Sequence, residues 1–365
     1  MPVWLRGFFK VANAPAAFRV SAFLLMLHSI ITTIQEPTLS VFGLVECLAA
    51  CGGKLIVAGD SKGPAKFEGP AGMPWPVEFL SLADQEASGF RLAVNLPTRH
   101  YARKNIAYLH AIRSGAECIY ETDDDNAPLA DWQPREERID GSRVLMAPEV
   151  KRWVNVYRYF TEENIWPRGL PLDEIRQTLP AVGAAGRPLR APVQQGLVNG
   201  SADVDAIWRL VMDRDFAFDD GPSVYLEPGN WCPFNTQTTW WWPVAYPLLY
   251  ISSHCSFRMC DIWKSFVAQR CLWAMGMGVV FHAPEVVQDR NPHDLMRDFR
   301  DEIPGYDLNR RIAEILDGLE LESGEDAVGA NLRACYASLI DAGIFPEKEM
   351  DLVDAWLEDV RKVES

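Results

Sequence analysis

The chain is organised around one stretch, Cys118-Ile119-Tyr120-Glu121-Thr122-Asp123-Asp124-Asp125-Asn126. An apolar beginning and an acidic end are typical of a buried strand that carries polar side chains to the edge of a sheet. Adjacent carboxylates repel one another by about 4 kcal/mol at roughly 4 Å and an effective dielectric constant of about 20. A divalent cation reverses this cost, because Mg²⁺ and Mn²⁺ bind carboxylate, water and phosphate oxygens. The three aspartates, called the acidic cluster below, therefore predict a metal site, with a solvated acidic turn as the alternative.

The segments before this stretch predict the sheet that holds it. Residues 29–34 are β-branched and apolar, residues 39–50 have a helical pattern, and residues 54–58 form a second apolar run. Strand, helix and strand within about thirty residues open a parallel α/β sheet. A further helix is expected over residues 102–114, directly before the strand of the acidic cluster. The acidic cluster would then lie at the carboxyl end of a strand, where open α/β sheets bind ligands.

Composition narrows the classes of function. The chain has 365 residues, 48% of them hydrophobic and 23% charged, with a formal net charge of -15. This charge argues against nucleic acid as a partner and against a general anionic membrane surface, while peripheral membrane association stays open. The eight cysteines show neither a C-x-x-C pair nor zinc-ribbon spacing, which predicts reduced thiols in a reducing compartment. We therefore expect a cytoplasmic protein.

The pattern of helices and loops predicts three regions. Residues 1–27 form an N-terminal lead, residues 28–305 an α/β domain, and residues 306–365 a C-terminal helical appendage. The appendage is expected to contain three amphipathic helices, over residues 308–318, 326–342 and 347–362. The apolar run at residues 20–27 is shorter than the roughly 20 residues that a membrane-spanning helix needs. We therefore expect no transmembrane span.

Basic and imidazole side chains gather at the start of the helix before the acidic cluster: Arg99, His100, Arg103 and Lys104. Cations at a helix N-terminus oppose the helix dipole, so an anionic group should lie near them. A nucleotide diphosphate would provide that charge. A solvated basic helix start is the alternative.

Three consecutive tryptophans, at positions 240–242, are the most unusual stretch of the chain. Three neighbouring side chains cannot all face one core, so at least one indole is expected to be exposed or to line a cleft. An indole in a cleft can stack on a sugar or a base. Trp240 is the candidate for this role.

Further acids stand at two expected helix starts. Asp203 and Asp205 precede a helix at residues 207–212, and Asp261 follows Arg258 at the start of a helix over residues 261–275. Acids at these positions stabilise a helix N-terminus. They are also candidates for a carboxylate that acts at a reacting sugar.

Several of these segments resemble one known family. Seven segments, in consistent order along residues 28–305, look like the corresponding motifs of the STELLO glycosyltransferase-like proteins. They are residues 31–34, 57–62, 102–109, 120–126, 155–157, 165–169 and 260–266. Among them are Ala58-Gly59-Asp60-Ser61-Lys62 and Cys260-Asp261-Ile262-Trp263-Lys264. The chain is more distantly similar to the reversibly glycosylated polypeptides, which are UDP-arabinopyranose mutases and also carry an Asp-Asp-Asp motif.

This resemblance implies a GT-A-like fold, with a mixed, mostly parallel sheet flanked by helices. It also implies that Asp123 contacts the nucleotide sugar, Asp125 the metal, and Asp261 the reacting sugar. A late histidine, His282 or His293, is a candidate additional metal ligand. STELLO proteins are Golgi membrane proteins with a transmembrane anchor, and their cellular role is not carried over because no span is expected here.

The sequence thus predicts a metal-dependent glycosyltransferase that uses Mn²⁺ or Mg²⁺, a nucleoside-diphosphate sugar such as a UDP-sugar, and a glycan or small acceptor. A UDP-sugar mutase and a non-catalytic partner of polysaccharide synthesis are the alternatives. The catalytic candidates are Asp203, Asp205 and Asp261. The candidates for nucleotide-sugar binding are Asp60, Lys62, Arg103, Lys104, Asp123, Asp124, Arg168, Trp240 and Arg258. The candidate metal ligands are Asp123, Asp125, His282 and His293.

Overall fold

The computed structural model describes residues 26–140, 143–145, 152–289 and 294–364. The expected N-terminal lead therefore lies almost wholly outside the described residues, and so does His293. All eight cysteines are described, and all are free thiols. No helix in the described part of the chain is both long and apolar enough to cross a bilayer.

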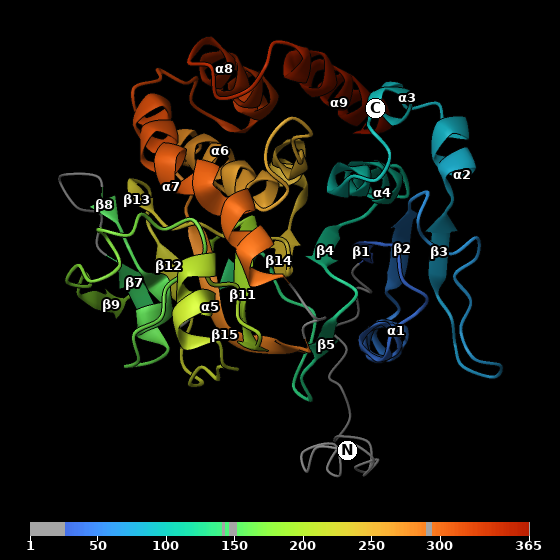
Figure 1. Cartoon of the computed structure of the whole chain (residues 1–365), viewed down its shortest axis with the longest axis horizontal. Coiled ribbons are helices and arrows are strands. Elements are labelled where there is room, and N and C mark those ends of the chain that lie inside the picture. Colours follow the sequence, from blue (N-terminus) through green and yellow to red (C-terminus); the bar gives the residue numbers. More distant parts are fainter. Residues whose placement is uncertain (1–25, 141–142, 146–151, 290–293, 365) are drawn as a thin grey trace.

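One large sheet runs through the molecule (Figure 1) in the order β3-β2-β1-β4-β14-β11-β15-β12-β7-β9, with β5 paired to β15. Its strands are β1 (Leu27–Thr33), β2 (Lys54–Gly59), β3 (Val77–Leu80), β4 (Cys118–Thr122), β5 (Asn126–Pro128), β7 (Arg143–Leu145), β9 (Val182–Ala184), β11 (Val193–Gly200), β12 (Val224–Leu226), β14 (Thr238–Trp241) and β15 (Val279–Gln288). Two short sheets pair β6 (Arg138–Ile139) with β10 (Leu189–Arg190) and β8 (Arg152–Trp153) with β13 (Asn230–Trp231).

Strand direction matches the expected fold class. Strands β3, β2, β1 and β4 are parallel to their neighbours. Strand β14 is antiparallel to both β4 and β11, and β11 is again parallel to β15. Strand β12 is antiparallel to β15 and parallel to β7, and β5 is antiparallel to β15. A sheet with a parallel run at one side and reversed strands further on is consistent with a GT-A-like fold. The prediction of a mixed, mostly parallel α/β sheet is confirmed.

Helices cover both faces of the sheet. They are α1 (Leu39–Cys51), α2 (Leu82–Ala87), α3 (Arg91–Asn95), α4 (Lys104–Arg113), α5 (Ala206–Met212), α6 (Cys260–Ala274), α7 (Leu295–Asp317), α8 (Val328–Asp341) and α9 (Lys348–Glu364). Helix α1 begins where the sequence predicts, because the Thr38 side chain accepts a hydrogen bond from the Val41 amide. It ends at Gly52, whose φ of 74° is the left-handed conformation of a helix C-cap.

The sheet separates two hydrophobic cores, because alternate side chains of a strand point to opposite faces. Ile30 and Ile119 belong to the core shared with α4 and α6, whereas Ile31 and Tyr120 belong to the core shared with α1. The same alternation corrects the prediction for residues 240–242. All three tryptophans are buried: the side chain of the second enters the first core, and those of the other two enter the second core. The expectation that one indole would be exposed is wrong.

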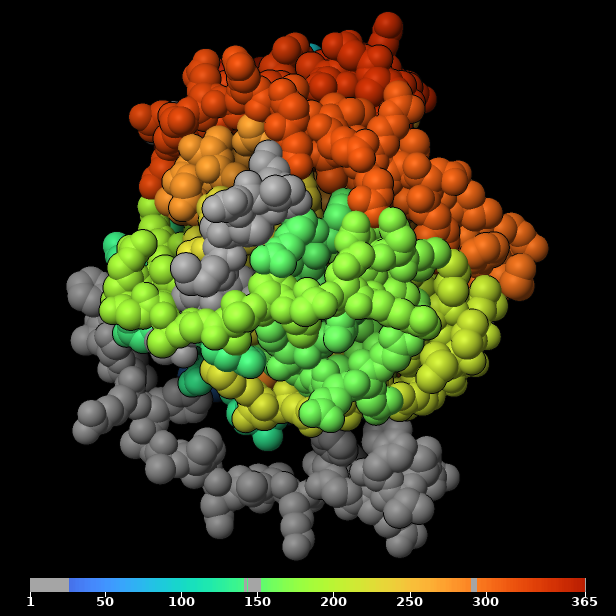
Figure 2. All heavy atoms as spheres, turned by 90° about the vertical axis from the view of Figure 1, so that its left-hand side faces the viewer, coloured from blue at the N-terminus to red at the C-terminus, as the bar shows by residue number. Residues whose placement is uncertain are grey.

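The C-terminal helices pack on the rest of the molecule. Helix α7 runs through the boundary expected at residues 305 and 306, and Ile312, Leu332 and Trp356 belong to the same hydrophobic cluster as α4. The Asp359 carboxylate accepts hydrogen bonds from the first amides of α3 at 3.0 and 2.8 Å. Figure 2 shows these helices, in orange and red, as a layer directly over the middle of the chain. The described residues of this region therefore belong to the core that contains α4 and α6, called the main core below, and form no separate core of their own.

Candidate functional site

A cavity of about 450 Å³ lies at the carboxyl ends of β1, β2 and β4. The strand ends form one side of it, and the loops before α5 and α6 form the other. This is the edge at which an open α/β sheet binds ligands. The predicted site residues that line the cavity are Asp60, Lys62, Asp123, Asp124, Asp125, Arg168, Asp203, Arg258 and Asp261.

Protein donors hold the first two members of the acidic cluster. The Tyr101 hydroxyl donates to Asp123 Oδ1 at 2.7 Å, and the Lys104 ammonium lies 3.2 Å from the same oxygen. The Thr33 hydroxyl donates to the Asp124 carboxylate. These contacts come from the last residue of β1, from the 3-10 turn at Tyr101–Arg103 and from the first residue of α4. The two carboxylates are therefore oriented by the strand next to β4 and by the start of the helix before it.

Asp125 has an unsatisfied oxygen. Gln288 Nε2 donates to Asp125 Oδ2 at 3.0 Å, but Oδ1 is buried and has no hydrogen-bond partner among the described residues. Burial, together with the charge of Asp123, raises the pKa of Asp125 to about 7. A buried acceptor without a donor is costly, and a cation would satisfy it.

The acidic cluster fits a divalent cation of the magnesium or manganese type. Within the described residues, no group of three or more His, Cys, Asp or Glu side chains is placed so that the group could hold a metal ion. Mg²⁺ sites commonly use one or two protein carboxylates and take their other ligands from water and substrate phosphates. Asp125, with Asp123 beside it, provides such a partial ligand set.

We expect the substitution Asp125→Asn to stabilise the metal-free protein. The pKa of this carboxyl is raised from 3.8 to about 7 by folding, so its contribution to stability is present below about pH 4 and is lost as the pH rises to about 7. The gain from the substitution should therefore grow over this range and level off at higher pH. Thermal unfolding in chelator at several pH values measures it, and Asp131→Asn controls for net charge. A variant less stable than wild type at pH 8 would contradict this expectation.

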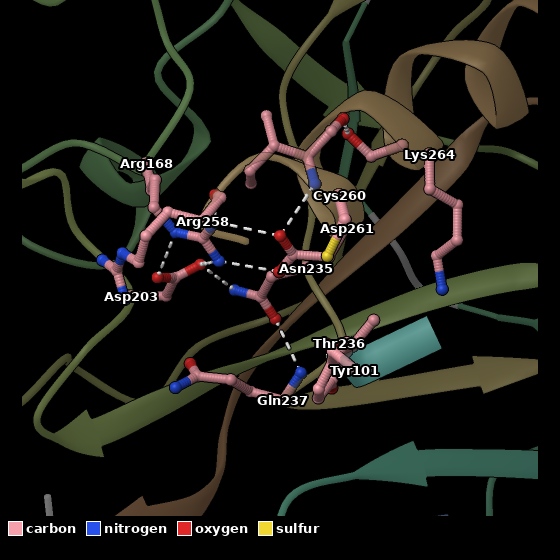
Figure 3. Close-up of polar contacts among 12 residues, drawn as sticks. Tyr101, Arg168, Asp203, Asn235, Thr236, Gln237, Arg258, Cys260, Asp261 and Lys264 are labelled. Carbon is pink, nitrogen blue, oxygen red and sulfur yellow. Dashed lines mark hydrogen bonds and ion pairs between the residues drawn. The ribbon is translucent and has the colours of Figure 1, made fainter. Parts of the chain in front are cut away.

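Across the cavity, Arg168 holds two buried carboxylates (Figure 3). Its Nε and Nη2 lie 2.8 and 3.0 Å from the Asp203 oxygens, and its Nη1 and Nη2 lie 2.9 and 2.7 Å from those of Asp261. Asn235 donates to Asp203 at 2.8 Å. Burial alone would raise the pKa of Asp203, but the charge and hydrogen bonds of Arg168 hold it below its usual value. We call Arg168, Asp203 and Asp261 the Arg168 cluster.

Local backbone structure aims Arg168 at its partners. Pro167 forms a bridge with Val204, which brings the loop beside Asp203. Gly169 has a φ of 90°, and a Cβ there would lie 2.4 Å from the Ile262 side chain. Only glycine therefore lets the loop approach the first turn of α6 so closely.

Comparison with known proteins places the chain beside one family. The profile described as STELLO glycosyltransferases matches residues 258–365. "Probable glycosyltransferase STELLO2" of Arabidopsis thaliana is 26% identical over a match that covers 92% of this chain and 44% of that protein. "Probable glycosyltransferase STELLO1" of the same plant is 25% identical, with 91% and 44% covered.

The chain is similar to the STELLO glycosyltransferases. It spans less than half the length of these two curated relatives. The part that the family profile matches begins at Arg258 and includes Asp261, so one member of the Arg168 cluster lies within it. The resemblance expected from the sequence motifs is confirmed.

Other predicted residues of this chain lie outside the cavity lining. Arg103 is buried and donates to Gln85 and to backbone carbonyls, so its charge supports the loop before α4. Lys104 is fully buried and reaches Asp123 from behind the cavity. Trp240 lies in the core, where its Nε1 donates to Glu285 at 2.7 Å.

Asp205 and His282 have structural partners. Asp205 is the N-cap of α5 and accepts a hydrogen bond from the Trp208 amide at 2.8 Å, as its capping interpretation predicts. Both ring nitrogens of His282 are engaged, one with Ser223 Oγ at 2.6 Å and the other with Gln194 Oε1 at 2.9 Å. Neither side chain lines the cavity, and this arrangement gives His282 no free nitrogen for a metal ion.

Sequence reasoning did not select Tyr101, Phe257, Glu121 or Lys264 for the site. The Tyr101 hydroxyl contacts both Asp123 and Thr236. Tyr101 lies among the basic residues before α4, and this position is the sequence feature that could have indicated its role. Phe257 lines the cavity but has no sequence pattern around it that marks this role.

Proposed function

We propose that this chain carries the catalytic domain of a glycosyltransferase that uses a divalent metal ion and a nucleoside-diphosphate sugar, with a UDP-sugar as the donor to test first. One observation carries the proposal: the acidic cluster and the Arg168 cluster face the same cavity at the carboxyl edge of the sheet. The printed names of the two plant relatives, each a probable glycosyltransferase, support the same reaction class.

In this proposal the two sides of the cavity have different tasks. Asp125 and Asp123 hold Mn²⁺ or Mg²⁺, which neutralises the diphosphate leaving group when bound. Lys62 and Arg99 are exposed at the strand side and supply positive charge for the phosphates. On the opposite side, Asp261 is kept in one orientation by Arg168 and accepts hydrogen bonds from the reacting sugar. Binding and orientation at these fixed positions are what lower the barrier to transfer.

Donor binding tests this function directly. We expect a UDP-sugar with Mn²⁺ to raise the melting temperature of the protein, because a ligand that binds only the folded state stabilises it. The shift should fall strongly in chelator and in the variant Asp125→Asn. UDP-, GDP- and CMP-sugars should be compared, with and without Mn²⁺, in thermal shift and calorimetric titrations.

Asp131→Asn is the matched control, because it removes an exposed acid that does not line the cavity. It should keep the full shift. The proposal fails if no nucleotide sugar binds in the presence of Mn²⁺, or if binding is the same in Asp125→Asn as in wild type.

A further inference from the structure

The two sides of the cavity differ in how their positive charges are used. Lys62 and Arg99 are exposed at the strand side. On the loop side, Arg168 is bound to the two carboxylates of its cluster, and Arg258 is bound to Glu302 with N–O distances of 2.8 and 2.6 Å. An anionic ligand on the loop side would have to compete with these carboxylates, so this side favours an uncharged one.

Phe257 is the exposed aromatic residue of the loop side. Its side chain is 58% exposed although it lines the cavity. The ring meets that of Tyr101 edge to face, with centroids 5.8 Å apart and an interplanar angle of 79°. The Tyr101 hydroxyl in turn donates to Asp123. Phe257 is thus linked through Tyr101 to the acidic cluster, and the next residue in the chain, Arg258, accepts a hydrogen bond from Arg168 at its carbonyl.

An aromatic ring beside buried carboxylates has a definite ligand chemistry. A sugar ring presents C–H groups on its faces, which pack against an aromatic surface, and hydroxyls around its rim, which donate to carboxylates. An ionised carboxylate accepts hydrogen bonds and donates none. Arg168 keeps the carboxylates of Asp203 and Asp261 in place. Phosphate offers no apolar face and would be repelled by the two acids.

We propose that the space between Phe257 and the Arg168 cluster is a subsite for an uncharged sugar ring, with Phe257 as its platform and the two carboxylates as hydroxyl acceptors. The inference rests on the proposed function only for the source of this ring, which is either the donor sugar or a sugar of a neutral acceptor glycan. The ring chemistry is the same for both sources.

Equilibrium titrations of the Mn²⁺-containing protein separate the two sources. The probes are UDP, UDP-glucose, UDP-galactose, neutral hexasaccharides of glucose, xylose and mannose, and an oligogalacturonide as the anionic comparison. Wild type is compared with Phe257→Ala, with Phe257→Trp, which keeps an aromatic face, and with Val94→Ala. Val94 is 67% exposed and does not line the cavity, so its substitution is the matched control.

If the ring belongs to the donor, Phe257→Ala should weaken UDP-sugar binding about tenfold and leave UDP unchanged. If it belongs to the acceptor, the same substitution should weaken a neutral hexasaccharide about tenfold and leave both UDP and UDP-sugars unchanged. In either case Phe257→Trp should restore binding and Val94→Ala should have no effect.

Three results would overturn the subsite. Phe257→Ala could weaken UDP itself as much as UDP-sugars, which would make the ring a platform for the base. It could leave every probe that binds unchanged, or wild type could bind the oligogalacturonide more tightly than the neutral hexasaccharides. A Phe257-dependent hexasaccharide that binds a protein without affinity for UDP-sugars would support the subsite and refute the proposed donor.

Discussion

We expect Lys264→Met to destabilise the protein by about 3–5 kcal/mol, because removing one partner of a buried ion pair leaves the other charge uncompensated. The Lys264 ammonium lies 2.9 and 3.0 Å from the two Glu121 oxygens, and both side chains are 1% exposed or less. Glu121 also accepts hydrogen bonds from Trp241 Nε1 and from the Tyr108 hydroxyl. These neutral donors cannot replace the lost charge. Denaturation with urea measures the change.

The double variant Glu121→Gln with Lys264→Met is the matched control. It removes both charges, and the amide oxygen of the glutamine still accepts from Trp241 Nε1 while its amide nitrogen can donate to the Tyr108 hydroxyl. The double variant should therefore recover a large part of the lost stability. A single Lys264→Met variant that stays within about 1 kcal/mol of wild type would contradict this expectation.

The same ion pair has a consequence for the site. Glu121 belongs to β4, two residues before the acidic cluster begins, and Lys264 belongs to the first turns of α6, three residues after Asp261. The pair therefore ties the strand that carries the acidic cluster to the helix that carries Asp261. Loss of this ion pair should therefore make the position of Asp261 relative to the acidic cluster less fixed, in addition to destabilising the core.

Local patterns were enough to predict the edge of the sheet. The apolar run before the acidic cluster predicts a buried strand, which β4 confirms, and the cap residues Thr38 and Gly52 fix the ends of α1. Helix α7 shows where local rules fail. Pro304 and Gly305 discourage a helix, yet α7 begins at Leu295 and continues through both. Packing of its apolar face on the main core outweighs the local penalty.

The sequence supplied residues of the loop side as site candidates, but it could not predict their contacts with one another, because these contacts join distant residues. Arg168 meets Asp203 after 35 residues and Asp261 after 93, and Glu121 meets Lys264 after 143. No spacing rule links such positions. The family resemblance supplied Asp261, but its arginine partner follows only from the path of the chain.

Asp261→Asn should lower kcat by about 10²-fold or more and leave the dissociation constant of the donor nearly unchanged. The carboxylate accepts from Arg168 Nη1 and Nη2 at 2.9 and 2.7 Å and lines the cavity. An amide in its place presents one acceptor and one donor to a guanidinium that offers only donors. The side chain would then turn, and the hydroxyl acceptor at the sugar would be lost. Turnover of a UDP-sugar and calorimetric binding separate the two parameters.

Asp205→Asn is the matched control, because it is also a buried acid near a helix start but does not line the cavity. Asn also caps a helix well, but its amide oxygen cannot accept from both the Trp208 amide and Trp166 Nε1, so the substitution should cost about 1 kcal/mol of stability. It should leave kcat nearly unchanged. If Asp261→Asn instead loses stability but turns over its donor at the wild-type rate, Asp261 serves the dipole of α6. The carboxylate that acts at the sugar would then have to be Asp203, since it is the other acid that Arg168 holds at the cavity.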